Sequence, residues 1–145
     1  MSARELVAQA RGSGDFNALV QRVPFLVFLG LQVEERGGHL LGRLPFSPHL
    51  VGNPELPALH GGALGGLLES AAHLEVLRRA ESLVLPKTIT LTIDYLRSGK
   101  PVDTWVSARI VKHGRRVASV HASAWQDDEA SPIATATVHL LVLPE

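Results

Sequence analysis

The chain has 145 residues, of which 46% are hydrophobic and 19% charged; this predicts one globular domain with its own core and excludes a disordered chain. Fourteen basic side chains balance fourteen acidic ones, so we expect no basic surface for nucleic acid. The absence of cysteine excludes disulfides, thiol nucleophiles and cysteine-ligated metal sites.

The N-terminal segment mixes charged with apolar residues and has no signal-peptide core. No stretch approaches the roughly 18 uninterrupted apolar residues of a membrane-spanning helix. We therefore expect a cytoplasmic protein without a membrane partner. Residues 2–11 and 15–23 predict two short amphipathic helices, and the apolar segment 25–29 can be of either type.

A β-hairpin follows, with strands at 31–35 and 38–46, because Gly37-Gly38 supplies a two-residue turn. The proline-rich segment 47–59 predicts a long irregular loop, and such loops often carry function. The chain from Gly61 to about Glu81 has no proline and almost no β-branched residue, which predicts one long helix.

After this helix the pattern changes to a period of two residues. In 88–95 Ile89, Leu91, Ile93 and Tyr95 share one predicted face, and Thr88, Thr90, Thr92 and Asp94 share the other. Further strands are expected at 102–112, 117–126 and 132–143. Because short turns join these strands, the sheet is expected to be largely antiparallel, and the class is α+β.

The long helix has two different faces. Leu64, Leu67, Ala71 and Leu74 fall on the side expected to bury against the sheet. Glu69 lies opposite, in a stripe with Gly62, Gly65, Gly66, Ala72, His73 and Val76. Each interior glycine costs roughly 1 kcal/mol relative to alanine, so the adjacent pair Gly65-Gly66 needs a reason. It either lets another element pack closely or leaves room for a ligand beside Glu69.

Glu69 is a candidate acid, base or nucleophile, because the face that carries it is otherwise nearly uncharged. Most glutamates are solvated helix residues, which is the alternative here. His73 lies one turn further on and could pair with it. The sequence has no HExxH motif and no third ligand at a sensible spacing, so we expect no metal site.

The start of the helix is a second candidate site. Gly61 and Gly62 follow His60, which is expected to leave free amides at the positive end of the helix dipole. Such amides can bind an anion or polarise a carbonyl. Glu69 is eight residues past Gly61, or about 12 Å along a continuous helix. One carbonyl cannot contact both groups of one chain at about 3 Å, so joint action requires a second copy of the chain.

These residues form a recognisable pattern: Asn53, His60-Gly61-Gly62, Glu69, a threonine-rich strand ending in Tyr95-Leu96-Arg97, and Gly114-Arg115-Arg116. The pattern resembles hotdog-fold acyl-CoA thioesterases, in particular the phenylacetate-degradation and 4-hydroxybenzoyl-CoA type. The resemblance covers residues 31–145 as the thioesterase domain and leaves residues 1–30 as an N-terminal helical extension.

The resemblance implies a long central helix wrapped by a curved antiparallel sheet, and a homodimer or dimer of dimers. Glu69 of one subunit attacks the thioester or activates water, and the Gly61 amide of the other holds the carbonyl oxygen. His60 and Asn53 orient the reactants. The substrate is an acyl-CoA, no cofactor is needed, and the residues expected to contact it are Gly62, His73, Arg97, Arg115 and Arg116.

Two other functions fit the same residues less well. A hotdog hydratase or dehydratase would use a His and acid pair, but the expected Asp with a His five residues later is absent. A non-catalytic acyl-CoA-binding module would bind in the same site without cleavage. The acyl group stays open, because the apolar candidates for its site accept an aromatic ring or an aliphatic chain: Phe25, Phe28, Phe46 and Leu50.

Overall fold

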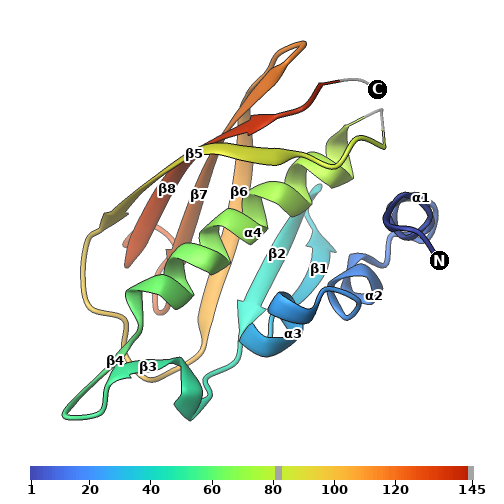
Figure 1. Ribbon diagram of the computed structural model, residues 1–145. Helices are drawn as coiled ribbons and strands as arrows, with labels where there is room; N and C mark the ends of the chain where they lie inside the picture. Colours follow the sequence, from blue (N-terminus) through green and yellow to red (C-terminus); the bar gives the residue numbers. More distant parts are fainter. Residues whose placement is uncertain (81–82, 144–145) are drawn as a thin grey trace.

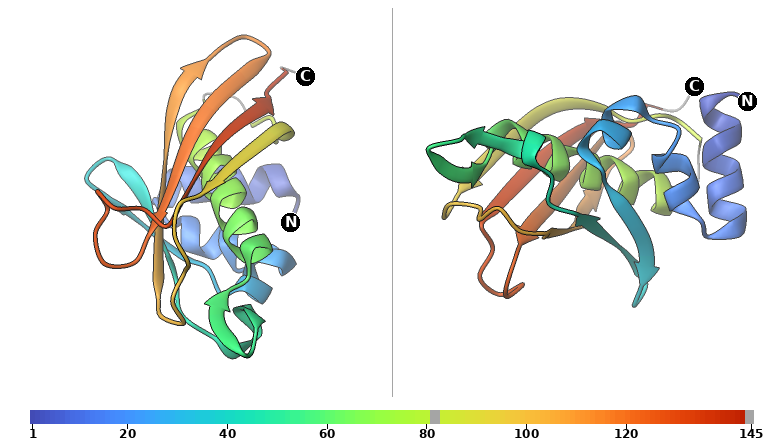
Figure 2. Two further views of the ribbon diagram at one scale, coloured as in Figure 1. Left: turned by 90° about the vertical axis from the view of Figure 1, so that its left-hand side faces the viewer. Right: turned by 90° about the horizontal axis from the view of Figure 1, so that it is seen from below.

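The computed structural model describes residues 1–80 and 83–143. A long helix, α4 (Gly61–Arg79), packs against one face of an antiparallel sheet, and the N-terminal helices lie on the same side of that sheet (Figure 1, Figure 2). These are α1 (Ala3–Ser13), α2 (Phe16–Val20) and α3 (Pro24–Leu29). The predicted α+β class is confirmed. The segment 25–29, for which the sequence did not decide between helix and strand, is helical. The predicted helix end at Glu81 lies outside the described residues.

Within the described residues the main sheet has the strand order β1-β2-β6-β7-β8-β5, and every neighbouring pair is antiparallel. The strands are β1 (Gln32–Arg36), β2 (His39–Leu44), β5 (Lys87–Tyr95), β6 (Thr104–His113), β7 (Val117–Trp125) and β8 (Ala134–Leu141). The edges of the sheet are therefore β1 and β5, and each edge presents backbone groups that another strand could pair with.

The turn between β1 and β2 forms at Gly37-Gly38 as predicted. Both glycines have positive φ, at 62° and 83°, which is the conformation that a type I′ hairpin turn requires. The turn is tied to α4, because the Arg78 guanidinium donates to the Gly38 carbonyl at 2.6 Å and to the Glu75 carboxylate at 2.7 Å. Glu75 is buried by this arrangement, which the helix pattern did not indicate.

The prediction of an irregular loop over 47–59 is wrong. This segment holds a 3-10 turn, η1 (Pro48–Leu50), and a small hairpin of β3 (Val51–Asn53) and β4 (Leu56–Leu59). The Asn53 side-chain oxygen accepts a hydrogen bond from the Glu55 amide at 3.0 Å, and this bond closes the hairpin turn. The hairpin is anchored by its last residue, whose amide donates to the Gly99 carbonyl at 2.9 Å.

Burial of α4 extends further around the helix than predicted. Leu64, Leu67 and Leu74 are buried as expected, and Ala71 is half-buried. Ala72 and Val76, which the sequence grouped with Glu69, are also buried. The flanks of the helix are covered by β5 on one side and the N-terminal helices on the other (Figure 1). In the described part of the chain, no helix is long and apolar enough to cross a membrane.

Candidate active site

His60 is the N-cap of α4. Its Nδ1 accepts a hydrogen bond from the Gly62 amide at 2.8 Å, and its own amide donates to the Leu50 carbonyl at 2.7 Å. The expectation of a free amide is therefore wrong for Gly62, because the imidazole occupies it. An accepting Nδ1 places the proton of the neutral ring on Nε2. His60 is exposed, so this N–H is available as a donor to substrate or water.

Gly61 is the first residue of the helix. Its amide has no hydrogen-bond acceptor among the described residues, as expected for the first N–H groups of a helix. Its carbonyl accepts a hydrogen bond from the Tyr95 hydroxyl at 2.7 Å, so the end of β5 holds the start of α4 in place. The free N–H lies at the positive end of the helix dipole, where it can stabilise negative charge.

Glu69 is half-buried and lies two turns along the same continuous helix. The glycines beside it serve close packing, one of the two interpretations that the sequence left open. A Cβ at Gly65 would lie 2.8 Å from Ile93 of β5, and one at Gly66 would lie 2.7 Å from the Phe25 ring of α3. Glu69 is therefore held on a narrow strip of helix between β5 and α3.

His73 continues this strip and is bonded to β5. Its Nε2 lies 2.8 Å from the Thr88 hydroxyl. Burial lowers the pKa of His73, and the nearby Glu69 charge opposes this effect by raising it. The predicted grouping of Thr88 with Thr90 is wrong, because the ladder to β8 has a bulge at Ile89 that turns Thr88 towards the helix.

Asn53 is exposed near the start of α4. Its neighbour Gly52 packs against His60, and a Cβ at Gly52 would lie 3.1 Å from the imidazole. The side-chain oxygen of Asn53 is engaged in the hairpin turn, which leaves its NH₂ group as the available donor. The structure thus brings Asn53 to the same end of the helix as His60 and Gly61, and its chemical role stays a prediction.

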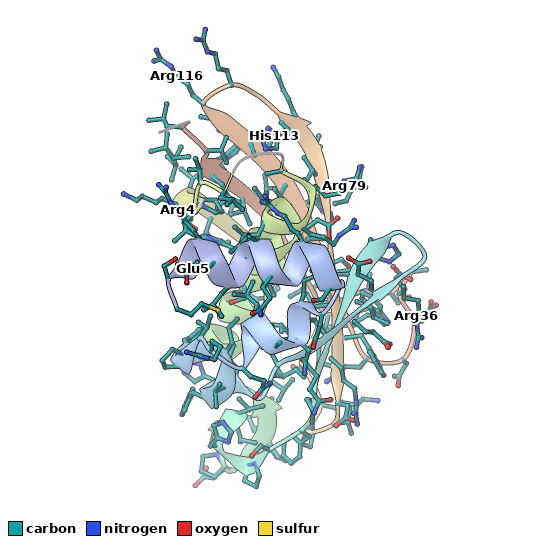
Figure 3. All side chains as sticks on the ribbon, turned by 90° about the vertical axis from the view of Figure 1, so that its right-hand side faces the viewer. Arg4, Glu5, Arg36, Arg79, His113 and Arg116 are labelled. Atoms are coloured by element: carbon teal, nitrogen blue, oxygen red, sulfur yellow. The ribbon has the colours of Figure 1, made fainter. Side chains whose placement is uncertain are left out.

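The three arginines expected near CoA are all exposed, but one chain does not bring them together. Arg97 follows β5, at the end of the sheet where α4 begins. Arg115 and Arg116 form the β6–β7 turn at the opposite end, and Figure 3 shows Arg116 far from the β3–β4 hairpin. Among the described residues, no group of three or more His, Asp or Glu side chains is arranged to hold a metal ion.

An apolar cleft of about 350 Å³ opens beside Glu69, between α4 and the N-terminal helices. We call it the N-terminal cleft; Leu6, Leu26, Leu74 and Leu77 are among its lining residues, together with Glu69 and His73. The four residues expected to line an acyl site separate in the structure: Phe25 lines this cleft, Phe28 is exposed, Leu50 is buried in the core and Phe46 packs against it.

Known proteins share this architecture. A sequence model of the family described as "Acyl-CoA thioesterase N-terminal domain" matches residues 53–141. The medium/long-chain acyl-CoA thioesterase YigI of Salmonella typhimurium is 30% identical, over 85% of this chain and 88% of that protein. A protein of known crystal structure from Chromobacterium violaceum is 37% identical in sequence, with a TM-score of 0.78 and 96% of each chain covered. A Bacillus halodurans protein solved with CoA is 25% identical, with a TM-score of 0.77 and coverage of 96% and 92%.

These likenesses, together with the long helix on a curved antiparallel sheet, define the class as hotdog-fold thioesterases. Within that class the chain belongs to the acyl-CoA thioesterase family. It is an enzyme that hydrolyses acyl-CoA thioesters, as the sequence pattern of Asn53, His60-Gly61-Gly62 and Glu69 implied.

Proposed function

We propose that the enzyme hydrolyses medium- or long-chain acyl-CoA in the cytoplasm, without a cofactor, at a site shared between two subunits of a homodimer. The observation that carries the shared site is the continuity of α4 from Gly61 to Arg79. It keeps the free Gly61 amide and Glu69 of one chain about 12 Å apart along the helix. The acyl class follows the name of the Salmonella typhimurium relative.

The free edge of β5 is the proposed contact between the subunits. This strand holds α4 at two points, by Tyr95 at Gly61 and by Thr88 at His73. Antiparallel pairing of two β5 strands about Leu91 would set the Tyr95 end of one strand beside the Thr88 end of the other. Gly61 of the partner subunit would then lie near His73, one turn from Glu69. A dimer of dimers would repeat this site.

Glu69 would perform the chemistry in one of two ways. Its carboxylate attacks the thioester carbonyl carbon directly and water then cleaves the resulting anhydride, or it removes a proton from the water that attacks. In either case negative charge develops on the carbonyl oxygen, where the Gly61 amide of the partner subunit donates. Collapse of the tetrahedral intermediate expels CoA as its thiolate. It leaves the free acid directly when water has attacked, and the Glu69 anhydride, which water then cleaves to the acid, when the carboxylate has attacked.

The remaining residues would position the substrate. The Nε2–H of His60 and the NH₂ of Asn53 come from the same end of the helix as Gly61 and would orient the thioester or the water. Arg115 and Arg116 lie at the Lys87 end of the sheet, because Val117 and Lys87 both pair with Leu141. The partner's Arg97 would approach that same end. A guanidinium fork suits the phosphates of CoA.

The test measures the hydrolysis of acyl-CoA by the Glu69→Gln enzyme through the free thiol that the reaction releases. The amide keeps the shape of the side chain and removes its charge and basicity. We expect kcat to fall at least about a hundredfold, the range for loss of an acid-base or nucleophilic group, with a smaller change in KM. Glu34→Gln, an exposed change on β1, is the matched control and should keep wild-type kcat. An unchanged kcat in Glu69→Gln would remove this residue from the mechanism.

A further inference from the structure

The N-terminal cleft leads away from Glu69 along α4. Its α4 wall includes Glu69 and His73 at one end and Leu77 at the other. Glu69 and Leu77 are eight residues apart on a continuous helix, or about 12 Å. The opposite wall is formed by the N-terminal helices, with α3 near the Glu69 end and α1 over the C-terminal half of α4 (Figure 1).

The lining of the cleft selects against the polar parts of the substrate. Among the described residues that line it, Glu69 and the exposed Arg22 are the charged ones, and most of the others are aliphatic. CoA phosphates and the pantetheine amides would leave their hydrogen bonds unmade in such a lining. A hydrocarbon chain instead gains binding free energy with each methylene that it buries. A volume of about 350 Å³ lies within the range of small-molecule sites.

We propose that the N-terminal cleft holds the acyl chain of the substrate, and that Leu6 of α1 limits the chain length. This inference rests on the proposed function, because it starts the chain at a thioester held beside Glu69. A span of about 12 Å accommodates roughly eight to ten carbons of an extended chain with carbon–carbon bonds of about 1.5 Å. The substrates of this subsite are therefore straight medium-chain acyl groups rather than aromatic ones.

The end of the cleft has a fixed position. The Arg11 guanidinium near the end of α1 donates to the Leu77 carbonyl at 2.6 Å, which fastens α1 to α4. Leu6 and Val7 of α1 both line the cleft; Val7 is buried in the common core, and Leu6 is half-buried. A longer acyl chain therefore meets Leu6 rather than displacing the helix. Leu6 acts on specificity through the far end of the acyl chain and takes no part in the chemistry.

The experiment measures kcat/KM for butanoyl-, octanoyl-, dodecanoyl- and hexadecanoyl-CoA with Leu6→Trp, Leu6→Ala and Ala8→Trp enzymes. Leu6→Trp narrows the cleft at α1, so kcat/KM for octanoyl- and dodecanoyl-CoA should fall at least about tenfold relative to that for butanoyl-CoA. Leu6→Ala lengthens the cleft and should shift the preference to longer chains. Ala8 is exposed on the same helix and does not line the cleft, so Ala8→Trp should keep the wild-type profile.

The outcomes separate this inference from the proposed function. Opposite shifts of the chain-length preference in the two Leu6 variants support the acyl cleft. If Leu6→Trp does not fold, the shift in Leu6→Ala is enough to test it. A wild-type enzyme that hydrolyses the panel while both Leu6 variants keep its profile would overturn the inference and leave the function standing. Leu6 variants with an altered oligomeric state but an unchanged chain-length profile would assign the cleft to a second copy of the chain and overturn the inference. A wild-type enzyme that hydrolyses none of the panel would overturn both.

Discussion

We expect the two ring nitrogens of His60 to have separate tasks. Nδ1 caps α4 through the Gly62 amide, and Nε2 would be left to donate to the reactants. His60→Ala should lose about 1 kcal/mol of unfolding free energy with the cap, and also lose activity. In His60→Asn the side-chain oxygen can replace Nδ1 as the cap, so stability should recover while kcat stays low. Urea unfolding and kcat of both variants check this split. Full activity in His60→Asn would limit the role of His60 to capping.

The buried His73 should make stability depend on pH. Burial lowers its pKa in the folded chain below the ordinary 6.5, so the unfolded chain binds the proton more readily. Its contribution is therefore complete above pH 6.5 and is lost as the pH falls through 6.5 towards the folded pKa. His73→Gln removes this dependence, which is at most about 1.4 kcal/mol per pH unit.

Urea unfolding at about pH 5.5 and about pH 7.5 measures the effect. The loss of unfolding free energy between the two pH values should be smaller in His73→Gln than in the wild type. His113→Gln, a change at an exposed histidine on β6, is the control and should lose as much as the wild type. An equal loss in His73→Gln would show that the burial of His73 has no energetic effect.

At the scale of elements, α3 packs closely against α4 at Gly66. Alanine at Gly66 would gain about 1 kcal/mol in helix propensity, but its Cβ would lie 2.7 Å from the Phe25 ring. Gly66→Ala should therefore stabilise the Phe25→Ala protein by about 1 kcal/mol and the wild type by less, or destabilise it. A double-mutant cycle by urea unfolding should give a coupling of at least about 0.5 kcal/mol. Equal effects in both backgrounds would refute this packing role.

Elements that depend on local signals were predictable from the sequence. The β1–β2 turn follows from Gly37-Gly38, and α4 follows from its composition and its absence of proline. The small hairpin at 51–59 was not predictable, because its turn is closed by a side-chain hydrogen bond that Asn53 accepts from the Glu55 amide. The orientation of Thr88 was also missed, since the bulge at Ile89 arises from pairing with β8 and leaves no mark in the alternation.

The candidate site shows the same division. The separation of Gly61 and Glu69 was predictable, because a continuous helix sets it whatever surrounds the helix. The occupied Gly62 amide and the bond from Tyr95 to Gly61 were not, since both depend on side chains that meet only in the folded chain. The N-terminal cleft was missed for a further reason. Its walls come from segments more than 40 residues apart, and their amphipathic patterns do not specify which faces meet.

At the scale of the whole molecule, the N-terminal helices are part of the same core as the thioesterase fold. Val7, Phe16 and Leu29 are buried in one cluster with α4 and the sheet. The division into residues 1–30 and 31–145 stays a prediction about the organisation of the sequence. In the folded chain these helices cover one flank of α4. They leave the outer edge of β5, on the other flank, free for the proposed second subunit (Figure 2).

The shared site can be tested with Gly61→Pro, which removes the amide donor without an evident conflict with the fold. Proline is favoured at the first position of a helix. His60 has φ −61° and ψ 130°, which suits the residue before a proline. A Cβ at Gly61 would meet the Tyr95 ring at 3.4 Å, an ordinary contact. Gly61→Ala keeps the amide and is the matched control, with activity near the wild type.

Two inactive enzymes should therefore restore each other. Gly61→Pro should lose about 3 kcal/mol of transition-state stabilisation with its donor, and Glu69→Gln lacks the carboxylate. A dimer with one subunit of each kind has one site with both an intact Gly61 and an intact Glu69. Random exchange puts about half of the dimers in this state, so roughly a quarter of wild-type activity should return. If both variants fold and native mass spectrometry shows that they exchange subunits, yet no thiol is released, then each site lies within one chain.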